Sequence, residues 1–344
     1  MTGESRNREI VIAELPTGVL EARHYDLREG EMPGAGEGDL VVRNVLMSID
    51  AANRAWMQGA TYRGAVEAGD RMPTYALAEV VESGDERFAP GTVVATESVW
   101  ADYARVPAAG AQPATRPPCR TAVPLSHALS LFGIAGKTAY HGLVGVGRPR
   151  AGETVVVSAA AGSVGMFAGQ IARALGCRVV GIAGGPEKCA WVADTLGFDA
   201  CVDYRDRGFS RALRGVCPGG IDVYFDNVGG PVLETVLFQM NERGRVVCCG
   251  AVSQYNESTP TGPRNLPGLV VVKRLRLEGF IVMDFAERDA DAGHALACWL
   301  DAGRLRVVED IVEGLENAPS ALIGLLAGEN RGKRMVRVGP DPEW

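Results

Sequence analysis

A glycine-bearing turn between two apolar runs is the part of this sequence best suited to binding a phosphate. The motif reads Ala159-x-x-Gly162-x-x-Gly165 and directly follows a β-branched run at 154–157. Glycine lets the backbone turn tightly and approach a phosphate closely, and the N-terminus of a following helix offers unpaired N–H groups and a favourable dipole. A second apolar run at 177–182 completes a strand, turn, helix and strand. The segment therefore predicts a dinucleotide pyrophosphate site, with a nucleotide-free α/β turn as the alternative.

The end of the second predicted strand indicates which dinucleotide the chain binds. In NAD-specific folds a carboxylate at this point accepts hydrogen bonds from the ribose hydroxyls. Here the strand runs into Gly184 and Gly185 without an acidic residue, so a 2′-phosphate is not repelled. Lys188 and Arg205 follow closely and supply positive charge, although each can also be an ordinary solvated residue. The sequence thus favours NADP(H) as the cofactor.

Alternating strand and helix patterns predict the scaffold that must position these residues. Predicted strands lie at 154–158, 178–182, 200–203, 223–227, 245–251 and 277–282, and predicted helices at 163–175, 187–196, 231–240 and 289–302. This alternation indicates an α/β fold with a Rossmann, doubly wound parallel sheet.

The chain before and after this region follows a different pattern. Apolar runs at 9–13, 39–48, 75–82 and 92–95 alternate with Gly, Pro and charge, which is typical of strands, and a helix-like stretch spans 126–143. A strand, helix and strand at 306–313, 317–327 and 333–338 end the chain, and they are placed most economically on the first domain. We therefore expect a β-rich domain at 1–128 and 309–344, and a Rossmann NADP-binding domain at 129–308.

Composition narrows the class of protein. The 344 residues are 47% hydrophobic and 22% charged, as in ordinary globular proteins, and the net charge of −7 disfavours nucleic acid as a partner. The sequence contains no run of about 18 apolar residues, so it predicts no membrane span. Its N-terminus lacks the apolar core of a signal peptide. Eight cysteines and four histidines occur without Cys-x-x-Cys or His-x-x-x-His spacing. We expect a cytoplasmic protein with reduced cysteines, no bound metal and no membrane partner.

The whole chain resembles the zinc-independent medium-chain dehydrogenases/reductases, and within them the leukotriene B4 12-hydroxydehydrogenase/prostaglandin reductase and alkenal double-bond reductase group. The resemblance rests on VVVSAAAGSVG from Val155, DVYFDNVGG from Asp222, CGAVSQYN from Cys249, LRLEGFIVMDF from Leu275 and VEGLENAPSALIGLLAGENRGKRMVRV from Val312. It extends from about residue 130 to the end, and it implies that the β-rich domain is a catalytic domain of the GroES-like type. The first 120 residues match more loosely, mainly at SIDAANRAWM from Ser48, where metal-using relatives would need a cysteine at Ser48.

The resemblance implies hydride transfer from NADPH to the β-carbon of an activated C=C bond in an α,β-unsaturated carbonyl. Negative charge then builds on the carbonyl oxygen as an enolate, where an enzyme should place hydrogen-bond donors. Tyr255 is the candidate to donate that hydrogen bond or a proton, with cofactor packing alone as the alternative. Cofactor contacts are expected from Thr138, Gly162, Ser163, Val164, Gly165, Gly184, Lys188, Tyr204, Asn227, Gly250, Ser253, Tyr255, Phe280, Val282 and Asn330.

Two departures from the family pattern affect the site. Relatives often carry Asp-Pro-Tyr-Met-Arg beside the nicotinamide, but Ala52 stands where that tyrosine would be, so a hydrogen-bond donor is lost and the pocket is wider. Gly185 replaces a serine that binds the 2′-phosphate in many relatives. The substrate pocket is then expected to be lined by Asn53 and Trp56, with Arg54 and Met57 as further candidates, and by Tyr62 from the loop at 58–73.

Three other functions remain open beside an NADPH-dependent ene-reductase. One is a reductive cyclase acting on a polyene or enone biosynthetic intermediate, and another is a quinone reductase. The third is a non-catalytic NADPH-binding protein. The resemblance also implies a small-molecule substrate and a homodimer, joined through edge strands such as the segment at 275–282.

Overall fold

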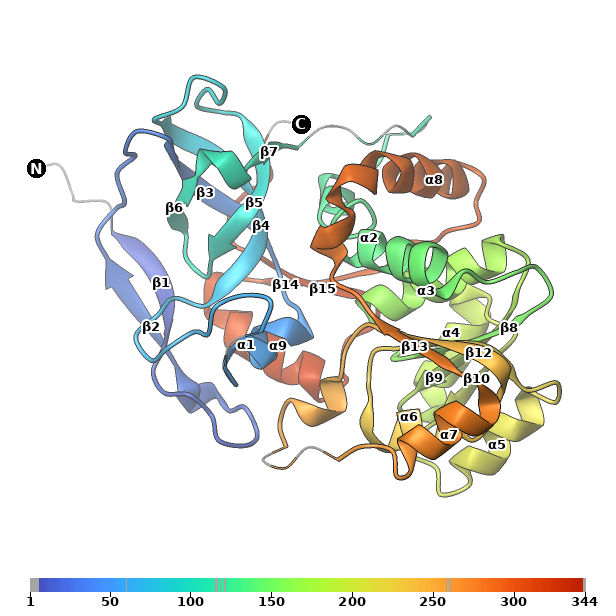
Figure 1. The fold of residues 1–344 in the computed structure, drawn as a ribbon. Helices are drawn as coiled ribbons and strands as arrows, with labels where there is room; N and C mark the ends of the chain where they lie inside the picture. The colour runs from blue at the N-terminus through green and yellow to red at the C-terminus, as the bar shows by residue number, and fades with distance from the viewer. Residues whose placement is uncertain are drawn as a thin grey trace, which may run out of the picture.

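Two sheets in opposite halves of the molecule organise the chain (Figure 1). The computed structural model describes residues 6–59, 61–114, 117, 119–120, 122–257, 259 and 261–342. One sheet has six strands in the order β10-β9-β8-β11-β12-β13, and the other has seven strands, with β14-β15-β3-β4-β5-β7 in order and β6 paired to β3. A separate antiparallel hairpin joins β1 (Asn7–Ile12) and β2 (Tyr25–Gly30). No helix in these described ranges is long and apolar enough to cross a membrane.

Parallel pairing throughout defines the six-stranded sheet. The chain runs outward from the middle strand to one edge and then crosses over to build the other half. Ligands of such sheets bind at the carboxyl ends of the strands where this reversal occurs, which is between β8 and β11 in this protein. The strands are β8 (Thr154–Ser158), β9 (Arg178–Ala183), β10 (Ala200–Asp203), β11 (Ile221–Asp226), β12 (Met240–Cys248) and β13 (Arg276–Gly279).

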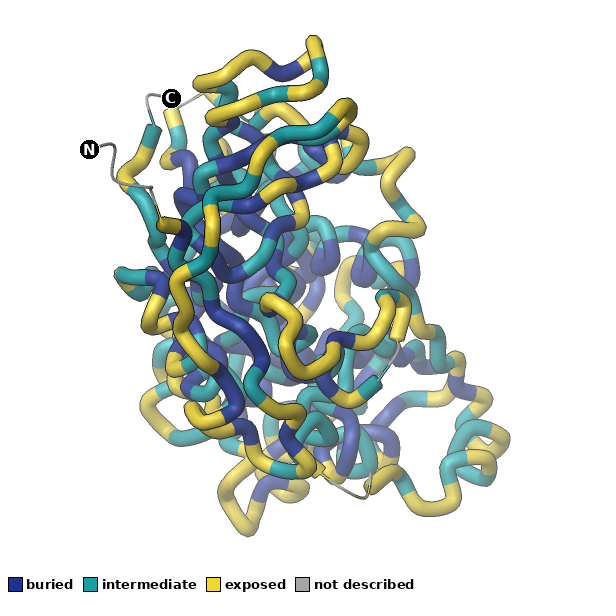
Figure 2. Tube along the Cα trace, turned by 90° about the vertical axis from the view of Figure 1, so that its left-hand side faces the viewer, coloured by how far each residue is buried: buried dark blue, intermediate teal, exposed yellow. Residues whose placement is uncertain are grey.

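Helices cover both faces of this sheet. Successive side chains of a strand point to opposite faces, so Val155 and Val157 enter one apolar cluster while Val156 enters another. Burial on both faces explains why these strands read as continuous apolar runs. Figure 2 shows buried segments running through the interior of the molecule, with exposed segments around them. The helices are α2 (Ile134–Tyr140), α3 (Ser163–Ala174), α4 (Pro186–Leu196), α5 (Phe209–Val216), α6 (Gly230–Leu237), α7 (Leu266–Lys273) and α8 (Asp289–Asp301).

The last segment of the chain returns to the N-terminal half. In Figure 1 the red β14, β15 and α9 lie among the blue and cyan elements, because β15 pairs antiparallel with β3 through Met335 and Ser48. The elements of this half are β3 (Asp39–Ser48), α1 (Ala51–Trp56), β4 (Pro73–Ser83), β5 (Val93–Val99), β6 (Tyr103–Pro107), β7 (Gln112–Pro113), β14 (Glu309–Glu313), α9 (Ala318–Leu326) and β15 (Lys333–Arg337). The boundaries expected at 128/129 and 308/309 stay a prediction.

Most predicted elements are confirmed, and the differences have local causes. The helix expected at 126–143 is broken into a 3-10 turn, α2 and a π-helical turn at His141–Gly147. A Cβ on Gly136 would lie 1.8 Å from the Leu131 carbonyl oxygen, so the chain is folded tightly onto itself there. The strand expected at 277–282 ends at Gly279, where a loop and a 3-10 helix begin. The sequence analysis missed β2, β6, β7, α1, α5 and α7.

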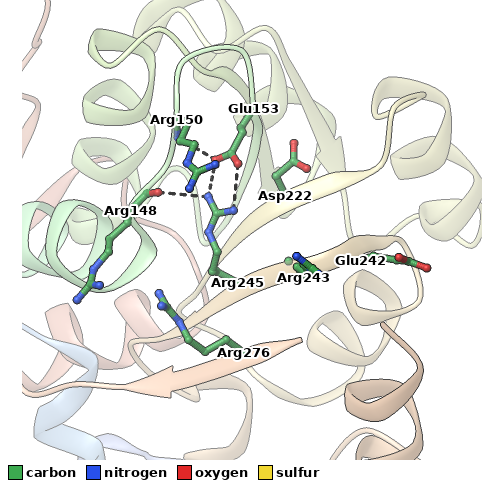
Figure 3. A pocket seen from close by; sticks show the side chains of 9 residues that line it. Arg148, Arg150, Glu153, Asp222, Glu242, Arg243, Arg245 and Arg276 are labelled. Carbon is green, nitrogen blue, oxygen red and sulfur yellow. Dashed lines mark hydrogen bonds and ion pairs between the residues drawn. The ribbon is translucent and has the colours of Figure 1, made fainter. Parts of the chain in front are cut away.

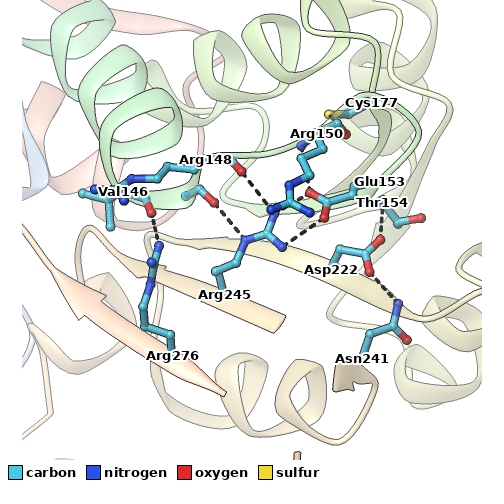
Figure 4. A network of polar contacts seen from close by, with 11 residues as sticks. Val146, Arg148, Arg150, Glu153, Thr154, Cys177, Asp222, Asn241, Arg245 and Arg276 are labelled. Carbon is cyan, nitrogen blue, oxygen red and sulfur yellow. Dashed lines mark hydrogen bonds and ion pairs between the residues drawn. The ribbon is translucent and has the colours of Figure 1, made fainter. Parts of the chain in front are cut away.

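Arginine side chains line a cavity of about 490 Å³ at the amino ends of the central strands (Figure 3). Hydrogen bonds and an ion pair connect these strand ends. The Arg245 guanidinium donates to both carboxylate oxygens of Glu153, one at 3.0 Å, and its Nε donates to the Gly147 carbonyl at 3.0 Å (Figure 4). Asp222 accepts from the Thr154 backbone N–H at 2.9 Å and from the Asn241 amide at 2.7 Å. These bonds join β8, β11 and β12 at the end opposite to the glycine turn.

The ion pair of Glu153 makes stability depend on pH. Burial raises the pKa of Glu153, but hydrogen bonds from Arg245 and the Arg150 backbone outweigh it and hold the pKa below its ordinary value. A lowered folded-state pKa adds stability above the unfolded-state pKa, and this is lost as the pH falls through the folded-state value. Glu153→Gln is expected to cost about 1–3 kcal/mol in urea unfolding at neutral pH. The difference from wild type should fade in acid.

The matched control is Glu242→Gln, which removes the ion pair with Arg274 on the exposed surface. It should cost less than about 0.5 kcal/mol. A cost of Glu153→Gln that stays constant from neutral to acid pH would contradict the assignment.

Candidate active site

A cavity of about 940 Å³ opens at the carboxyl ends of the parallel strands, and residues of both halves line it. It lies at the reversal of strand order, where the sheet topology places a ligand. The residues expected from the sequence to contact the cofactor, together with three of the residues expected in the substrate pocket, line this cavity. These residues are Asn53, Trp56, Tyr62, Thr138, Gly162, Ser163, Val164, Gly165, Gly184, Lys188, Tyr204, Asn227, Gly250, Ser253, Tyr255, Phe280, Val282 and Asn330.

The glycine turn shapes the middle of the cavity. Ala159 occupies the position of the usual first glycine with a left-handed backbone, φ 48°, and its carbonyl accepts from the Gly162 N–H at 2.8 Å. A Cβ at Gly165 would lie 2.2 Å from that carbonyl oxygen, so only glycine allows α3 to start this close to β8. Gly162 is the N-cap of α3. The first N–H groups of a helix have no partner within it, so they are available to a pyrophosphate.

One end of the cavity carries cations that form no ion pair with an acidic side chain in the part of the chain that the structure describes. Among the described residues, the Lys188 ammonium donates to the Gly328 carbonyl, and Arg205 donates to the Ala327 carbonyl at 3.4 Å. Burial, followed by nearby arginines, lowers the pKa of Lys188. A Cβ at Gly184 would lie 2.9 Å from the Arg205 Nε, so the glycine lets the guanidinium approach this end of the cavity. The geometry suits a phosphate dianion.

The acidic side chains close to this end of the cavity bind other groups of the protein. Glu187 follows Pro186 at the start of α4, but its side chain is 90% exposed and contacts Arg331 at 3.5 Å. The Asp203 carboxylate accepts from the backbone N–H groups of Gly185 and Arg205, each at 2.9 Å. Neither acid lines the cavity.

A buried carboxylate fixes the turn after β11, and the sequence analysis gave it no role. Asp226 accepts hydrogen bonds from the Tyr224 hydroxyl at 2.8 Å and from the backbone N–H groups of Val228 and Gly229 at 3.0 and 2.9 Å. Burial raises its pKa, although these bonds oppose the shift. The turn holds Asn227 in the cavity wall. The signal in the sequence was an acidic residue closing an apolar run.

Tyr255 lies at the other end of the cavity, just after a 3-10 turn at Val252–Gln254. Its hydroxyl oxygen accepts from the Ala251 N–H at 3.4 Å, which leaves the hydroxyl proton available to a ligand. Burial raises the pKa of Tyr255, so the group is a neutral donor at neutral pH. This geometry fits a hydrogen bond to a carbonyl or enolate oxygen.

The residues of α1 divide between the cavity and the interior. Asn53 lines the cavity, but its amide is engaged by the Asp50 N–H and the Pro73 carbonyl, both at 2.8 Å. Trp56 also lines it, with the Arg63 guanidinium 4.9 Å from its ring centroid. The further candidates Arg54 and Met57 were wrong, because both are buried and neither lines the cavity. Met57, just after this short helix, packs in an apolar cluster of the N-terminal half, and the Arg54 guanidinium donates to the Gly18 carbonyl at 2.8 Å and to the Asn256 side chain at 3.1 Å.

A buried lysine holds a carboxylate of the cavity wall in place, and no sequence pattern indicated this lysine. Lys333 is 1% exposed and donates to the Asp50 carboxylate at 2.8 Å and the Ile49 carbonyl at 3.1 Å. Asp50 also accepts from the Ser48 hydroxyl. Ser48 and Asp50 both line the cavity. Within the described part of the chain, no group of three or more His, Cys, Asp or Glu side chains is placed to hold a metal ion.

Comparison with known proteins places the chain among reductases. Family models described as "N-terminal domain of oxidoreductase" and "Zinc-binding dehydrogenase" match residues 8–114 and 163–296. The chain is 39% identical to an NADPH-dependent curcumin reductase of Escherichia coli, covering 98% of this chain and 99% of that protein. It is 36% identical to a tobacco (Nicotiana tabacum) 2-alkenal reductase that is NADP(+)-dependent, over 98% and 99%. CurA from Vibrio vulnificus in complex with NADPH superposes with a TM-score of 0.91, at 37% identity over 97% of this chain and 100% of that one.

The cation pair at Lys188 predicts selective affinity for a 2′-phosphate. Lys188→Ala is expected to weaken binding of 2′,5′-ADP by about 10- to 100-fold, because a charge-assisted hydrogen bond contributes about 1.5–3 kcal/mol. Binding of 5′-ADP, measured by the same calorimetric titration, should change less than about twofold. An equal loss for both nucleotides would contradict a contact to the 2′-phosphate.

Proposed function

We propose a function from the premise that this chain belongs to the zinc-independent medium-chain dehydrogenases/reductases. It is an NADPH-dependent ene-reductase, which transfers hydride to the β-carbon of an α,β-unsaturated carbonyl without a metal. The observation that carries this proposal is the cavity itself, because it is lined both by cations that form no ion pair among the described residues, suited to a 2′-phosphate, and by the half-buried Tyr255. The relatives named for curcumin and 2-alkenal reduction support the substrate class.

The residues fit the cofactor and leave room for a substrate. Lys188 and Tyr204 would hold the 2′-phosphate, and the N-terminus of α3 the pyrophosphate, while Phe280 and Val282 would face the nicotinamide. NADPH, when bound, supplies the hydride. Tyr255 would donate a hydrogen bond from Oη to the carbonyl oxygen, where negative charge develops as the β-carbon is reduced. Trp56 would form an apolar wall that keeps water from this end.

The proposal is tested by following NADPH oxidation with a panel of enones, enals and quinones, with NADH as the control cofactor and product mass read in parallel. An enone product heavier by two hydrogens, with little turnover of NADH, is the expected result. Faster turnover of quinones would favour a quinone reductase, and a cyclised product from a polyene substrate would favour a reductive cyclase. Tight NADPH binding without turnover of any compound would overturn the enzymatic proposal.

Tyr255→Phe is expected to lower kcat by about 10²-fold, because the developing enolate loses its donor while the ring is kept. The dissociation constant of NADPH should stay within about twofold, since the hydroxyl lies at the substrate end. Steady-state kinetics and a fluorescence titration measure the two quantities. Tyr103→Phe, a change in β6 away from the cavity, is the matched control. An unchanged kcat for Tyr255→Phe would assign the residue to cofactor packing.

We propose that the protein forms a homodimer through β13. This strand is one edge of the parallel sheet, so one side of its backbone lacks a strand partner. The neighbouring α7 exposes apolar side chains, with Val271 73% and Val272 70% accessible. A second copy would cover both features with one two-fold interface.

The double substitution Val271→Asp and Val272→Asp should convert the dimer to a monomer, because buried carboxylates without partners are costly. Light scattering after size-exclusion chromatography measures the mass. Leu27→Asp, at an exposed position of β2, is the control and should leave the mass unchanged. A monomeric wild-type protein would refute the proposed dimer.

We also propose the cytoplasm as its location, on the ground of its cysteines. All eight are free thiols, and burial raises the pKa of Cys177, Cys217 and Cys248 to about 11. Buried protonated thiols are unreactive and typical of proteins kept in a reducing compartment.

A further inference from the structure

Arg54 is a buried cation without an acidic partner among the residues that the structure describes. It lies on α1 with 1% of its surface exposed, and it takes part in no ion pair. Burial lowers the pKa of its guanidinium. Burying a charge without an oppositely charged partner costs free energy. The hydrogen bonds of Arg54 must therefore stabilise the fold or serve the function of the protein.

The contacts of Arg54 join the two halves of the molecule. Nη2 donates to the Gly18 carbonyl at 2.8 Å, within its own half. Nε donates to the side-chain oxygen of Asn256 at 3.1 Å, and Asn256 directly follows Tyr255 in the segment that leaves β12. One planar group therefore bonds both a loop of the N-terminal half and the segment that carries the tyrosine.

The helix that presents Arg54 is itself fixed. Asp50 and Asn53 form a capping box at the start of α1, in which side chain and backbone bond reciprocally. The buried Lys333 holds Asp50 from β15. Because α1 is anchored at its first turn, the position of the guanidinium is set by the N-terminal half.

We propose that Arg54 is a positioning residue, which holds the Tyr255–Asn256 segment against α1 so that the tyrosine hydroxyl stays at the substrate end of the cavity. The inference rests on the proposed function only in assigning Tyr255 to the reacting carbonyl. It deepens that function, because the donor would belong to one half of the molecule while its placement depends on the other. Arg54 itself does not line the cavity and touches no substrate.

The first test asks whether Arg54 acts through Tyr255. Arg54→Met is expected to lower kcat by about tenfold or more, because a small misplacement of a catalytic group is enough for such losses. The dissociation constant of NADPH should stay within about twofold. In a Tyr255→Phe background the same substitution should cost less than about twofold further. An equal loss in both backgrounds would overturn the proposal.

Two further variants separate the hydrogen-bond geometry from charge and folding. Arg54→Lys keeps the charge without the planar fork, so it should be impaired like Arg54→Met, whereas full activity would show that charge alone matters. Asn256→Ala leaves Arg54 in place and removes its acceptor in the other half of the molecule. It should reproduce the loss in kcat, and combining it with Arg54→Met should add nothing. An additive double variant would contradict the proposal.

Hydrogen exchange provides a readout that does not require turnover. In the NADPH-bound protein, amides at 252–257 should exchange at least about threefold faster in Arg54→Met than in wild type, since the segment loses its tether. Arg28→Met, at an exposed position of β2, is the matched control and should change nothing. Unchanged exchange would refute the positioning role. Faster exchange in a protein that reduces no enone would refute the proposed function instead.

Discussion

Burial of the parallel sheet on both faces dictates where this protein can place polar chemistry. Side chains within β8, β9 and β11 point into apolar clusters on one face or the other, so a charged group inside a strand would be desolvated without a partner. Polar function is confined to the strand ends. Asp226 illustrates this constraint. It is buried at the end of β11, and its carboxylate accepts hydrogen bonds from a tyrosine and two backbone N–H groups, which offset the cost of burial.

The charged residues at the two ends of the strands have different roles. At the amino ends, Arg245 forms an ion pair with Glu153 and donates hydrogen bonds to the backbone carbonyls of residues 147–148. These two charges therefore stabilise the sheet. At the carboxyl ends, Lys188 and Arg205 donate to backbone carbonyl groups, and the Arg205 guanidinium also lies over the Tyr204 ring. Both ends are rich in cations, and the carboxyl end combines its cations with helix N-termini and the glycine turn.

The sequence was sufficient for features set by neighbouring residues. Strands at 154–158 and 200–203 were predicted with the bounds that the structure shows, because apolar runs bounded by glycine and charge are local signals. Helix α7 was missed since LPGLVVVK combines glycine with three valines, a composition that favours strands. The pairing of Asp50 with Lys333 spans 283 positions, and no local pattern reports it. The direction in which Arg54 points is likewise set by packing, so the sequence left it as a candidate for the cavity wall.

The contrast between the cations at Lys188 and Arg54 has a consequence for ionic strength. Lys188 and Arg205 face an open end of the cavity, where dissolved ions screen attraction over about 8–10 Å at physiological salt. Arg54 bonds neutral oxygens from within the protein, where salt has little access. Added salt should therefore weaken capture of a phosphorylated cofactor while leaving the alignment of Tyr255 unchanged. In kinetic terms, salt acts on the cofactor's KM and spares the rate of the bound complex.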